Sequence, residues 1–278
     1  MSKFRAEQIE LAHGALAAGA APVAFAHLSD LHLGRWGPRQ EHLVETVARH
    51  DPDFVFVTGD VFHRHPHSLD CAARLFSQLR APRGVLTRGV FTRGVFMVRG
   101  NWDVCYGPPV RRLRGLLADW GADLLVNEGR IVQSAAGRVR IIGVDDPALG
   151  CPDFAAALAS GGPGPAFTVL LCHGPVGAYM LPQGHGVDLM LAGHTHGGQV
   201  RVPFWRRMPY RFYGGLTHGL HEVNSLRVYV SRGFGAVGKV RVRFRCPAEV
   251  TFFRVHGPRA RRRGAGGDET REDSAGWR

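Results

Sequence analysis

The sequence has little lysine. Lys3 and Lys239 are its only two lysines, so nearly all of its positive charge comes from arginine. The 35 Lys and Arg residues outnumber the 23 Asp and Glu residues, which gives a formal net charge of +12. The planar fork of arginine suits phosphate, nucleic acid or an anionic membrane surface. A GC-rich genome is the alternative explanation, because glycine and alanine are abundant as well.

Paired cysteines and long hydrophobic runs are also missing. The five cysteines are odd in number, widely spaced and without a C-x-x-C pair, which argues against a disulfide framework or a zinc knuckle and for a reducing compartment. Charges and histidine interrupt the first 25 residues, so we expect neither a signal peptide nor a transmembrane span. These absences predict a cytoplasmic protein whose contact with a membrane is at most peripheral, at its inner face.

Apolar runs of strand length alternate with stretches of helical period. The predicted strands are Val23–Asp30, Asp53–Asp60, Gly94–Asn101, Ala166–His173 and Val187–His194, and the predicted helices are Glu41–His50, Ser68–Leu79 and Val110–Trp120. After His196 the pattern is β-rich, in residues 225–233, 239–245 and 249–255. The order predicts an α/β fold with a βαβ start and a β-rich finish.

Composition predicts one domain over residues 23–256. Residues 1–22 are expected to form an N-terminal extension, and residues 257–278, rich in glycine and charge, a disordered tail. The segment Thr87–Phe96 is a tandem duplication of five residues. We interpret it as a lengthened loop before the third strand.

Every predicted strand ends in a side chain that can bind a metal. These residues are Asp30, His32, Asp60, Asn101, His173, His194 and His196. Loops that leave the carboxyl ends of strands converge on one edge of an α/β sheet. In extended backbone, residues i and i+2 point to the same side, so the pairs D-x-H and H-x-H are each expected to present two ligands to one place. The series predicts a single cluster.

Seven ligands are enough for two divalent ions about 3.5–4 Å apart, an arrangement that clamps both oxygens of an in-line phosphoryl displacement. Oxygen and nitrogen ligands without thiolate favour Mn, Fe, Zn or Co, with Mn first, over a structural zinc.

These motifs resemble those of the calcineurin-like metallophosphoesterase superfamily, whose pattern is D-x-H, G-D, G-N-H-D/E, H and G-H-x-H. The match covers about Val23 to Val255. "GHTHGGQV" with the following Pro203, then "GGL", "VYVSRGFG" and a late Pro-x-Glu, resembles in particular a bacterial branch of membrane-associated phosphodiesterases that includes hydrolases of UDP-2,3-diacylglucosamine. The resemblance implies a four-layer sandwich of two mixed β-sheets flanked by helices.

The resemblance also implies roles for the residues that match. Asp30, His32 and His196 would hold the first metal, Asn101, His173 and His194 the second, and Asp60 would bridge them. A metal-bridging hydroxide would attack phosphorus, so no protein nucleophile is needed. The catalytic set implied is Asp60, Asn101, Asp103 and His173.

Trp102 stands where the family has a histidine that protonates the leaving oxygen. Three explanations follow: the enzyme is impaired, another residue substitutes, or the leaving group needs no proton. For substitution, "FHRHPH" offers His63, Arg64, His65 and His67 beside the site. Trp102 itself either packs under its loop or stacks on a ring of the substrate, and we count Trp102, His63 and Arg64 as candidate substrate-binding residues.

The segment Val202–Gly215 mixes aromatic residues with arginines and favours a membrane boundary or an anionic lipid headgroup. The sequence thus predicts a hydrolase of phosphoric ester or diphosphate bonds, acting on a phosphate-containing small molecule or lipid. A nuclease is the second hypothesis, although no DNA-capping domain is evident and nucleic acid is not the expected partner. A scaffold that has lost catalysis is the third. The sequence does not predict an oligomeric state.

Overall fold

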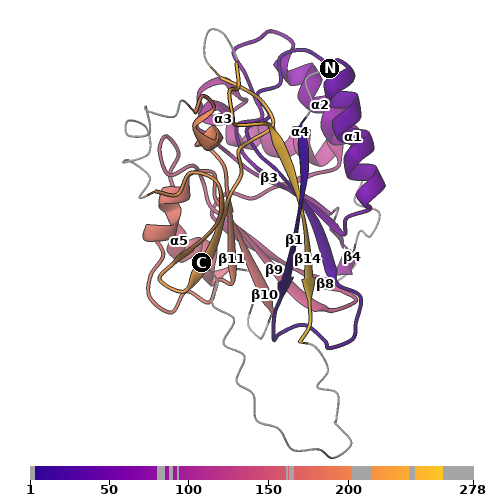
Figure 1. The fold of residues 1–278 in the computed structure, drawn as a ribbon, viewed down its shortest axis with the longest axis vertical. Helices are drawn as coiled ribbons and strands as arrows, with labels where there is room; N and C mark the ends of the chain where they lie inside the picture. Colours follow the sequence, from indigo (N-terminus) through magenta and orange to yellow (C-terminus); the bar gives the residue numbers. More distant parts are fainter. Residues whose placement is uncertain are drawn as a thin grey trace, which may run out of the picture.

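The computed structural model describes residues 4–79, 85–87, 90–92, 94–160, 162, 166–201, 215–237 and 242–258. Two mixed sheets of six strands each form the centre of the molecule, with helices outside them (Figure 1). This architecture confirms the expected α/β sandwich. The expected tail at 257–278 lies outside the described residues except for its first two positions.

The first sheet carries the N-terminal βαβ units. Its strands lie in the order β1 (Arg5–Ala12), β14 (Glu249–His256), β2 (Val23–Leu28), β3 (Phe54–Thr58), β6 (Val95–Val98) and β7 (Asp123–Leu124). The strands β2, β3, β6 and β7 are parallel, whereas β14 runs antiparallel to β2. The carboxyl ends of three parallel strands therefore share one edge, just before Asp30, Asp60 and Asn101.

The second sheet has the order β12 (Gly219–Val223), β13 (Leu226–Val230), β11 (Leu189–Ala192), β10 (Phe167–Leu171), β9 (Gly137–Gly143) and β8 (Glu128–Ser134). Its four central strands are parallel, and β12 and β8 run antiparallel at the two edges. His173 and His194 follow the carboxyl ends of β10 and β11, which are neighbours.

Alternation along the strands builds separate layers of core. In β3, Phe54 and Phe56 face the second sheet, while Val55 and Val57 face the helices. All four are buried, as expected for a parallel strand covered on both faces. Phe25 of β2 packs on Phe56 with 5.0 Å between the ring centroids, so the layer between the sheets is largely aromatic.

The helices are α1 (Pro38–His50), α2 (Ser68–Gln78), α3 (Asn101–Tyr106), α4 (Val110–Trp120) and α5 (Phe154–Ala159), with 3-10 turns η1 (Pro175–Tyr179) and η2 (His196–Gly198). Buried leucines of α1, α2 and α4 share one core layer with the first sheet, and α5 packs on the second. Proline at the first position of α1 fits the helix start, and Gly121 with φ 98° ends α4.

Three local expectations differ from the structure. Of the β-rich segment expected at residues 239–245, the described residues 242–245 form only an isolated bridge at Phe244. Residues Arg5–Ala12, which we assigned to an extension, form β1 and pair in parallel with β14 along their whole length. The duplicated segment is not simply a loop, because β4 (Val85–Thr87) and β5 (Val90–Thr92) pair as an antiparallel hairpin. The duplicated segment contributes Val90, Phe91 and Thr92 to β5. These residue types favour β-strands.

Candidate metal centre

The metal-capable residues lie in the loops that leave five strands and gather at one edge of the two sheets. Many of them have left-handed backbone: φ is 52° at Asp30, 44° at His32, 54° at Asp60, 69° at His194 and 52° at His196. The expectation that extended backbone aligns these pairs is therefore wrong. Left-handed φ is uncommon outside glycine, and such strained residues cluster at functional sites.

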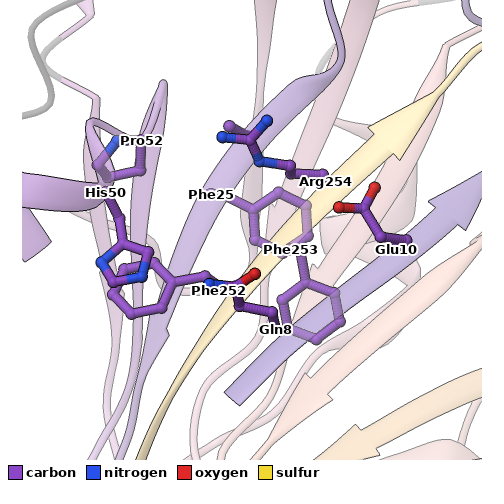
Figure 2. A pocket seen from close by; sticks show the side chains of 9 residues that line it. Gln8, Glu10, Phe25, His50, Pro52, Phe252, Phe253 and Arg254 are labelled. Carbon is purple, nitrogen blue, oxygen red and sulfur yellow. The ribbon is translucent and has the colours of Figure 1, made fainter. Parts of the chain in front are cut away.

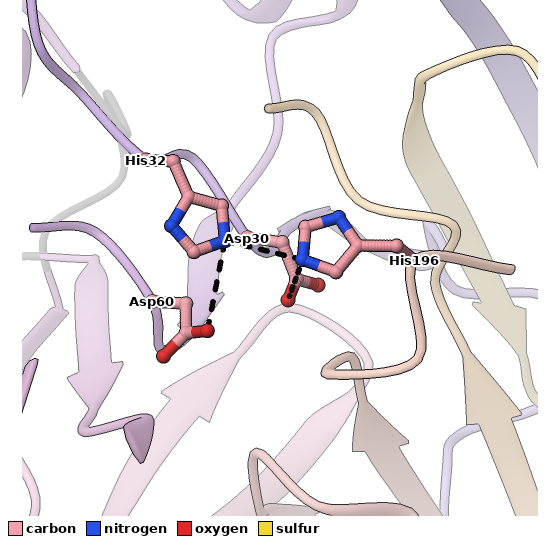
Figure 3. A group of neighbouring side chains, drawn as sticks. All are labelled: Asp30, His32, Asp60 and His196. Carbon is pink, nitrogen blue, oxygen red and sulfur yellow. Dashed lines mark hydrogen bonds and ion pairs between the residues drawn. The ribbon is translucent and has the colours of Figure 1, made fainter. Parts of the chain in front are cut away.

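The first group of ligand atoms comes from Asp30, His32, Asp60 and His196 (Figure 3). His32 Nε2 lies 3.1 Å from His196 Nε2 and 3.6 Å from Asp60 Oδ2, and His196 Nε2 lies 3.3 Å from Asp30 Oδ1. All four residues are buried. Four donors thus converge on one point away from water.

The second group contains Asp60, His173 and His194, and Asn101 lies against it. Asn101 Oδ1 is 3.2 Å from His173 Nε2 and 2.9 Å from His194 Nδ1. His173 Nε2 is 3.4 Å from Asp60 Oδ2, the same oxygen that faces His32. Asp60 therefore belongs to both groups. His194 and His196, two residues apart, point into different groups.

Charge and burial set the protonation of these ligands. Burial lowers the pKa of His32 to about 4, and burial also lowers the pKa of His194 to about 4. Burial acts in the same direction on His173, but the Asp60 carboxylate outweighs it and raises the pKa of His173 to about 10. Although burial opposes it, the contact with His173 holds the pKa of Asp60 below its usual range. In the absence of a cation, a proton on His173 thus balances part of the negative charge of the buried carboxylates.

This donor set fits divalent cations. The imidazole nitrogens of His32 and His196 face each other at 3.1 Å beside two buried carboxylates. Burial lowers the pKa of both histidines, so each neutral ring has one nitrogen lone pair to offer a cation. A cation there satisfies the lone pairs and the carboxylates together. Carboxylate, amide and imidazole ligands without thiolate suit Mn, Fe, Zn or Co.

Backbone contacts hold the ligands in place. His173 Nδ1 donates to the carbonyl of Thr58 at 2.7 Å, which leaves Nε2 directed at the second group. The backbone N–H of Trp102 donates to Asp60 Oδ1 at 2.8 Å, so Asp60 Oδ2 stays available to both groups. A Cβ at Gly100 would lie within 2.9 Å of the His173 ring. Glycine at this position therefore lets the loop approach the ligands.

A comparison with protein families matches residues 23–198 to the calcineurin-like phosphoesterase model. The chain belongs to this family. It is 30% identical to the uncharacterized metallophosphoesterase YkuE of Bacillus subtilis, over 81% of this chain and 76% of that protein. It is 27% identical to the phosphodiesterase YaeI of Escherichia coli, over 85% and 83%. Among solved structures, YfkN of Bacillus subtilis aligns with 77% of this chain and 82% of its own at 13% identity, with a TM-score of 0.44.

Membership makes the protein a metal-dependent phosphoesterase with a candidate metal site at the converging loops. The branch that hydrolyses UDP-2,3-diacylglucosamine is not established by these relatives. No described helix of this phosphoesterase is long and apolar enough to cross a membrane. The segment Val202–Gly215, which we associated with membranes, lies outside the described residues except for its last position.

Trp102 lies between the first group and a small aromatic cluster. Its ring meets the His32 ring edge-on at a centroid distance of 5.1 Å and stacks on His63 at 5.0 Å. Tyr106, 42% exposed, lies 5.0 Å from Trp102, and the guanidinium of Arg64 sits 5.6 Å above the Tyr106 ring. The structure therefore places Trp102, which is half-buried, and His63 beside His32, whereas Arg64 lies over Tyr106.

Asp103 lies outside both ligand groups. Its Oδ1 accepts from the backbone N–H groups of Val61 and Phe62 at 2.8 and 2.9 Å, and its Oδ2 accepts from Gly100 N at 2.8 Å. Burial raises the pKa of Asp103 to about 7, and these donors oppose the shift. We counted Asp103 among the catalytic residues. Its contacts are those of a positioning residue that joins the loops after β3 and β6.

Sequence reasoning missed several buried ion pairs around the site. Arg99 donates to both oxygens of Asp145, at 3.0 and 2.6 Å, and so joins the loop after β6 to the loop after β9. Arg232 donates to Glu249 at 2.6 Å. The late Pro-x-Glu motif contained Glu249, but nothing in the sequence identified its partner. Such pairings depend on contacts between segments far apart in the chain.

A hollow of about 220 Å³ lies on the first sheet, away from the metal-capable residues (Figure 2). Ala24 and Phe25 line it at the start of β2, whereas Asp30 follows the other end of that strand. His50 stacks on Phe252 within it, with centroids 3.7 Å apart. Its place on the fold separates it from the candidate metal centre.

Proposed function

We propose that the phosphoesterase holds two divalent cations, Mn²⁺ first among Mn, Fe, Zn and Co, with Asp60 as the ligand common to both. The observation that supports this proposal is the shared oxygen Asp60 Oδ2, which lies 3.6 Å from His32 Nε2 and 3.4 Å from His173 Nε2. When bound, such a pair of cations supplies Lewis acidity that activates water and offsets charge on phosphoryl oxygens. The proposed ligands are Asp30, His32, Asp60 and His196 for one cation, and Asp60, Asn101, His173 and His194 for the other.

The reaction proposed is hydrolysis of a phosphodiester or diphosphate bond. The chain contributes by orientation: Thr58 fixes the ring of His173, Trp102 N–H holds one oxygen of Asp60, and Asp103 ties together the loops that carry them. Asn101 offers a neutral amide oxygen between two histidines. These residues orient the ligands, and the proposed reaction needs no side chain as nucleophile.

The leaving group is proposed to be weakly basic. General acid catalysis typically accelerates the departure of an alkoxide by 10²–10⁴-fold. The family's histidine is replaced here by Trp102, whose indole N–H does not act as an acid near neutral pH. A nucleoside phosphate or an aryloxide departs as an anion without such help. Trp102, His63 and Arg64 are then proposed to contact the ring or the charge of that group. The position of Trp102 and His63 beside His32 supports this, and Arg64 lies over Tyr106, which contacts Trp102.

The substrate class that combines these features is a phosphate-containing small molecule or a lipid-linked diphosphate. UDP-2,3-diacylglucosamine is the first candidate because it offers a diphosphate bond and a ring-bearing leaving group. The named phosphodiesterase relative supports the bond type and says nothing of this substrate.

Metal analysis with a substrate panel tests the proposal. Protein purified with excess Mn²⁺ is expected to hold two ions per chain and to hydrolyse bis(p-nitrophenyl) phosphate. UDP-2,3-diacylglucosamine, cyclic nucleotides and DNA then separate lipid precursor, cyclic nucleotide and nuclease activities. Asp60→Asn is expected to abolish every activity and to lower the metal content, whereas Asp119→Asn, an exposed change on α4, leaves both unchanged. Full activity in Asp60→Asn contradicts a shared bimetallic site.

A further inference from the structure

A hollow of about 520 Å³ opens on the outer side of the two loops that follow β2 and β3. Arg35 and Trp36 line it from the first loop, His65 and His67 from the second, and Arg74 from α2. None of these residues belongs to either ligand group. The hollow is therefore a separate feature, built on the loops that carry His32 and Asp60.

Hydrogen bonds hold the two loops in a fixed register. His32 N donates to the carbonyl of Asp60 at 2.9 Å, and the next residue, Leu33, donates to the carbonyl of Val61 at 2.9 Å. Arg35 lies three residues beyond His32, so its Cα is at most about 11 Å from that of the ligand. A group extending from a phosphate at the metal centre can reach this distance within one small molecule.

The second loop packs closely against the first at Gly34. A Cβ at Gly34 would lie 3.4 Å from the side chain of His65. Beside it, Arg35 Nε donates to His65 Nε2 at 3.5 Å. The floor of the hollow is also braced: Trp36 Nε1 donates to Glu41 at 3.1 Å, and the guanidinium of Arg74 lies 4.5 Å from the Trp36 ring. The walls are thus set before a ligand arrives.

The charges of the hollow favour an anion. The two arginines, Arg35 and Arg74, are exposed at its walls. Asp70 also lines the hollow, but its side chain is 80% exposed and lies 3.7 Å from His67. Glu41 pairs with Arg74 and accepts from Trp36, so Arg35 is the arginine of the hollow whose contact within the described residues is not a carboxylate. Arg35 Nε donates to a histidine nitrogen and not to a carboxylate. The guanidinium of Arg35 therefore remains able to bind phosphate or carboxylate through two parallel hydrogen bonds.

We propose that this hollow binds a second anionic group of the substrate, a phosphate or a carboxylate, while the scissile phosphate lies at the metal centre, with Arg35 as the principal contact. The inference rests on the proposed function and deepens it. The preferred substrates then carry two negative groups separated by a short spacer, and Arg35 selects them over simple phosphodiesters.

Paired phosphonates test the proposal by isothermal titration with the Mn²⁺-loaded protein. Hexylphosphonate carries one anionic end, hexane-1,6-bisphosphonate carries two, and 7-phosphonoheptanoate carries a carboxylate at the second end. We expect the wild type to bind a two-ended probe about tenfold tighter than hexylphosphonate, as one charge-assisted contact allows. The better of the two-ended probes identifies phosphate or carboxylate as the preferred group.

Arg35→Ala is expected to remove this advantage without changing the affinity for hexylphosphonate, and Arg35→Lys is expected to keep part of it. Arg49→Ala is the matched control, because Arg49 is exposed near the far end of α1, about 17 Å along the helix from its start. Equal affinity of the wild type for one-ended and two-ended probes overturns the proposal, as does an advantage that survives in Arg35→Ala. Failure of the proposed function is seen separately, as absence of metal-dependent hydrolysis of bis(p-nitrophenyl) phosphate by the wild type.

Discussion

The left-handed backbone at Asp60 determines which substitution tests its role fairly. At φ 54°, most side chains would add strain of about 1–2 kcal/mol, but asparagine tolerates this region well. Asparagine also keeps an oxygen for the Trp102 N–H. Asp60→Asn therefore removes one negative charge from both ligand groups while leaving the local backbone as it is, so loss of activity in this variant reports on metal binding.

Trp102→His tests the leaving-group hypothesis. Restoring the family's histidine beside His32 is expected to raise hydrolysis of an alkyl phosphodiester by about 10²-fold, since general acid catalysis typically contributes 10²–10⁴-fold. Hydrolysis of bis(p-nitrophenyl) phosphate, whose leaving group needs no proton, is expected to change little. The measurement is kcat/KM for both substrates.

The ratio of the two rate constants is the informative quantity, because loss of the Trp102 ring contact with His63 affects both substrates alike. Trp102→Phe keeps an aromatic ring without an acid and serves as the control. An equal change for both substrates in Trp102→His counts against the hypothesis.

Asp103→Asn tests the positioning role of this carboxylate. An amide in its place presents NH₂ to one of the backbone N–H groups of Val61, Phe62 or Gly100 that the carboxylate now accepts. We expect a loss of about 1–2 kcal/mol in the free energy of unfolding, because an unmatched buried donor costs about 1–3 kcal/mol and removal of a buried charge whose pKa is raised offsets part of that cost. Urea denaturation measures it, with the exposed Asp119→Asn as control. Wild-type stability in Asp103→Asn would show that the three amides do not depend on the carboxylate.

At the scale of elements, apolar runs identified the five strands that carry ligands, because parallel strands buried on both faces are hydrophobic throughout. The same signal missed β1, whose residues are mostly exposed at a sheet edge, and the hairpin of β8 and β9, where arginines interrupt the apolar pattern. The ligands could be predicted since their side chains are chemically distinctive. The groups that hold these ligands in place could not be predicted. A backbone carbonyl such as that of Thr58 is present in every residue and leaves no signal in the sequence.

The loop after β13 illustrates support of this kind. Phe234 N and Gly235 N donate to the carbonyls of Ser29 and Asp30, at 2.9 and 2.6 Å. Glu249, 1% exposed, accepts from Arg232 through both backbone and side chain. An ion pair at the start of β14 thus fixes the loop that lies directly behind a ligand of the first group.

Glu249→Gln is expected to loosen this loop. The change leaves Arg232 with Glu7 as its remaining acidic partner at 3.1 Å. We expect about 2 kcal/mol less stability, below the 3–5 kcal/mol of a fully buried pair because Arg232 is 20% exposed. Metal affinity is expected to fall with it, whereas Glu222→Gln, exposed on β12, changes neither. Calorimetric titration with Mn²⁺ and urea denaturation provide the readouts, and an unchanged metal affinity would separate this pair from the site.

On the scale of the whole molecule, the two sheets contribute unequally to one centre. Asp30, His32, Asp60 and Asn101 follow strands of the first sheet, and His173, His194 and His196 follow strands of the second. Both ligand groups draw on both sheets, since Asp30 and His196 meet at 3.3 Å in the first and Asp60 and His173 meet at 3.4 Å in the second. Cations bound at the candidate metal centre would therefore join the two sheets at this edge.

Metal removal is therefore expected to lower the stability of the entire fold. A cation present at 100 times its dissociation constant stabilises the native state by about 2.7 kcal/mol, which for a chain of this size corresponds to a shift in Tm of roughly 5–10 °C. Differential scanning calorimetry of Mn²⁺-loaded and chelator-treated protein measures it. In Asp60→Asn, whose two ligand groups lack their shared charge, Mn²⁺ is expected to raise Tm much less. The metal-free variant is also expected to be less stable than the metal-free wild type, because the buried His173 loses the carboxylate that holds its proton. The same Tm for loaded and metal-free wild type would mean that Mn²⁺ does not bind the native state in preference to the unfolded chain, which contradicts the proposed metal centre.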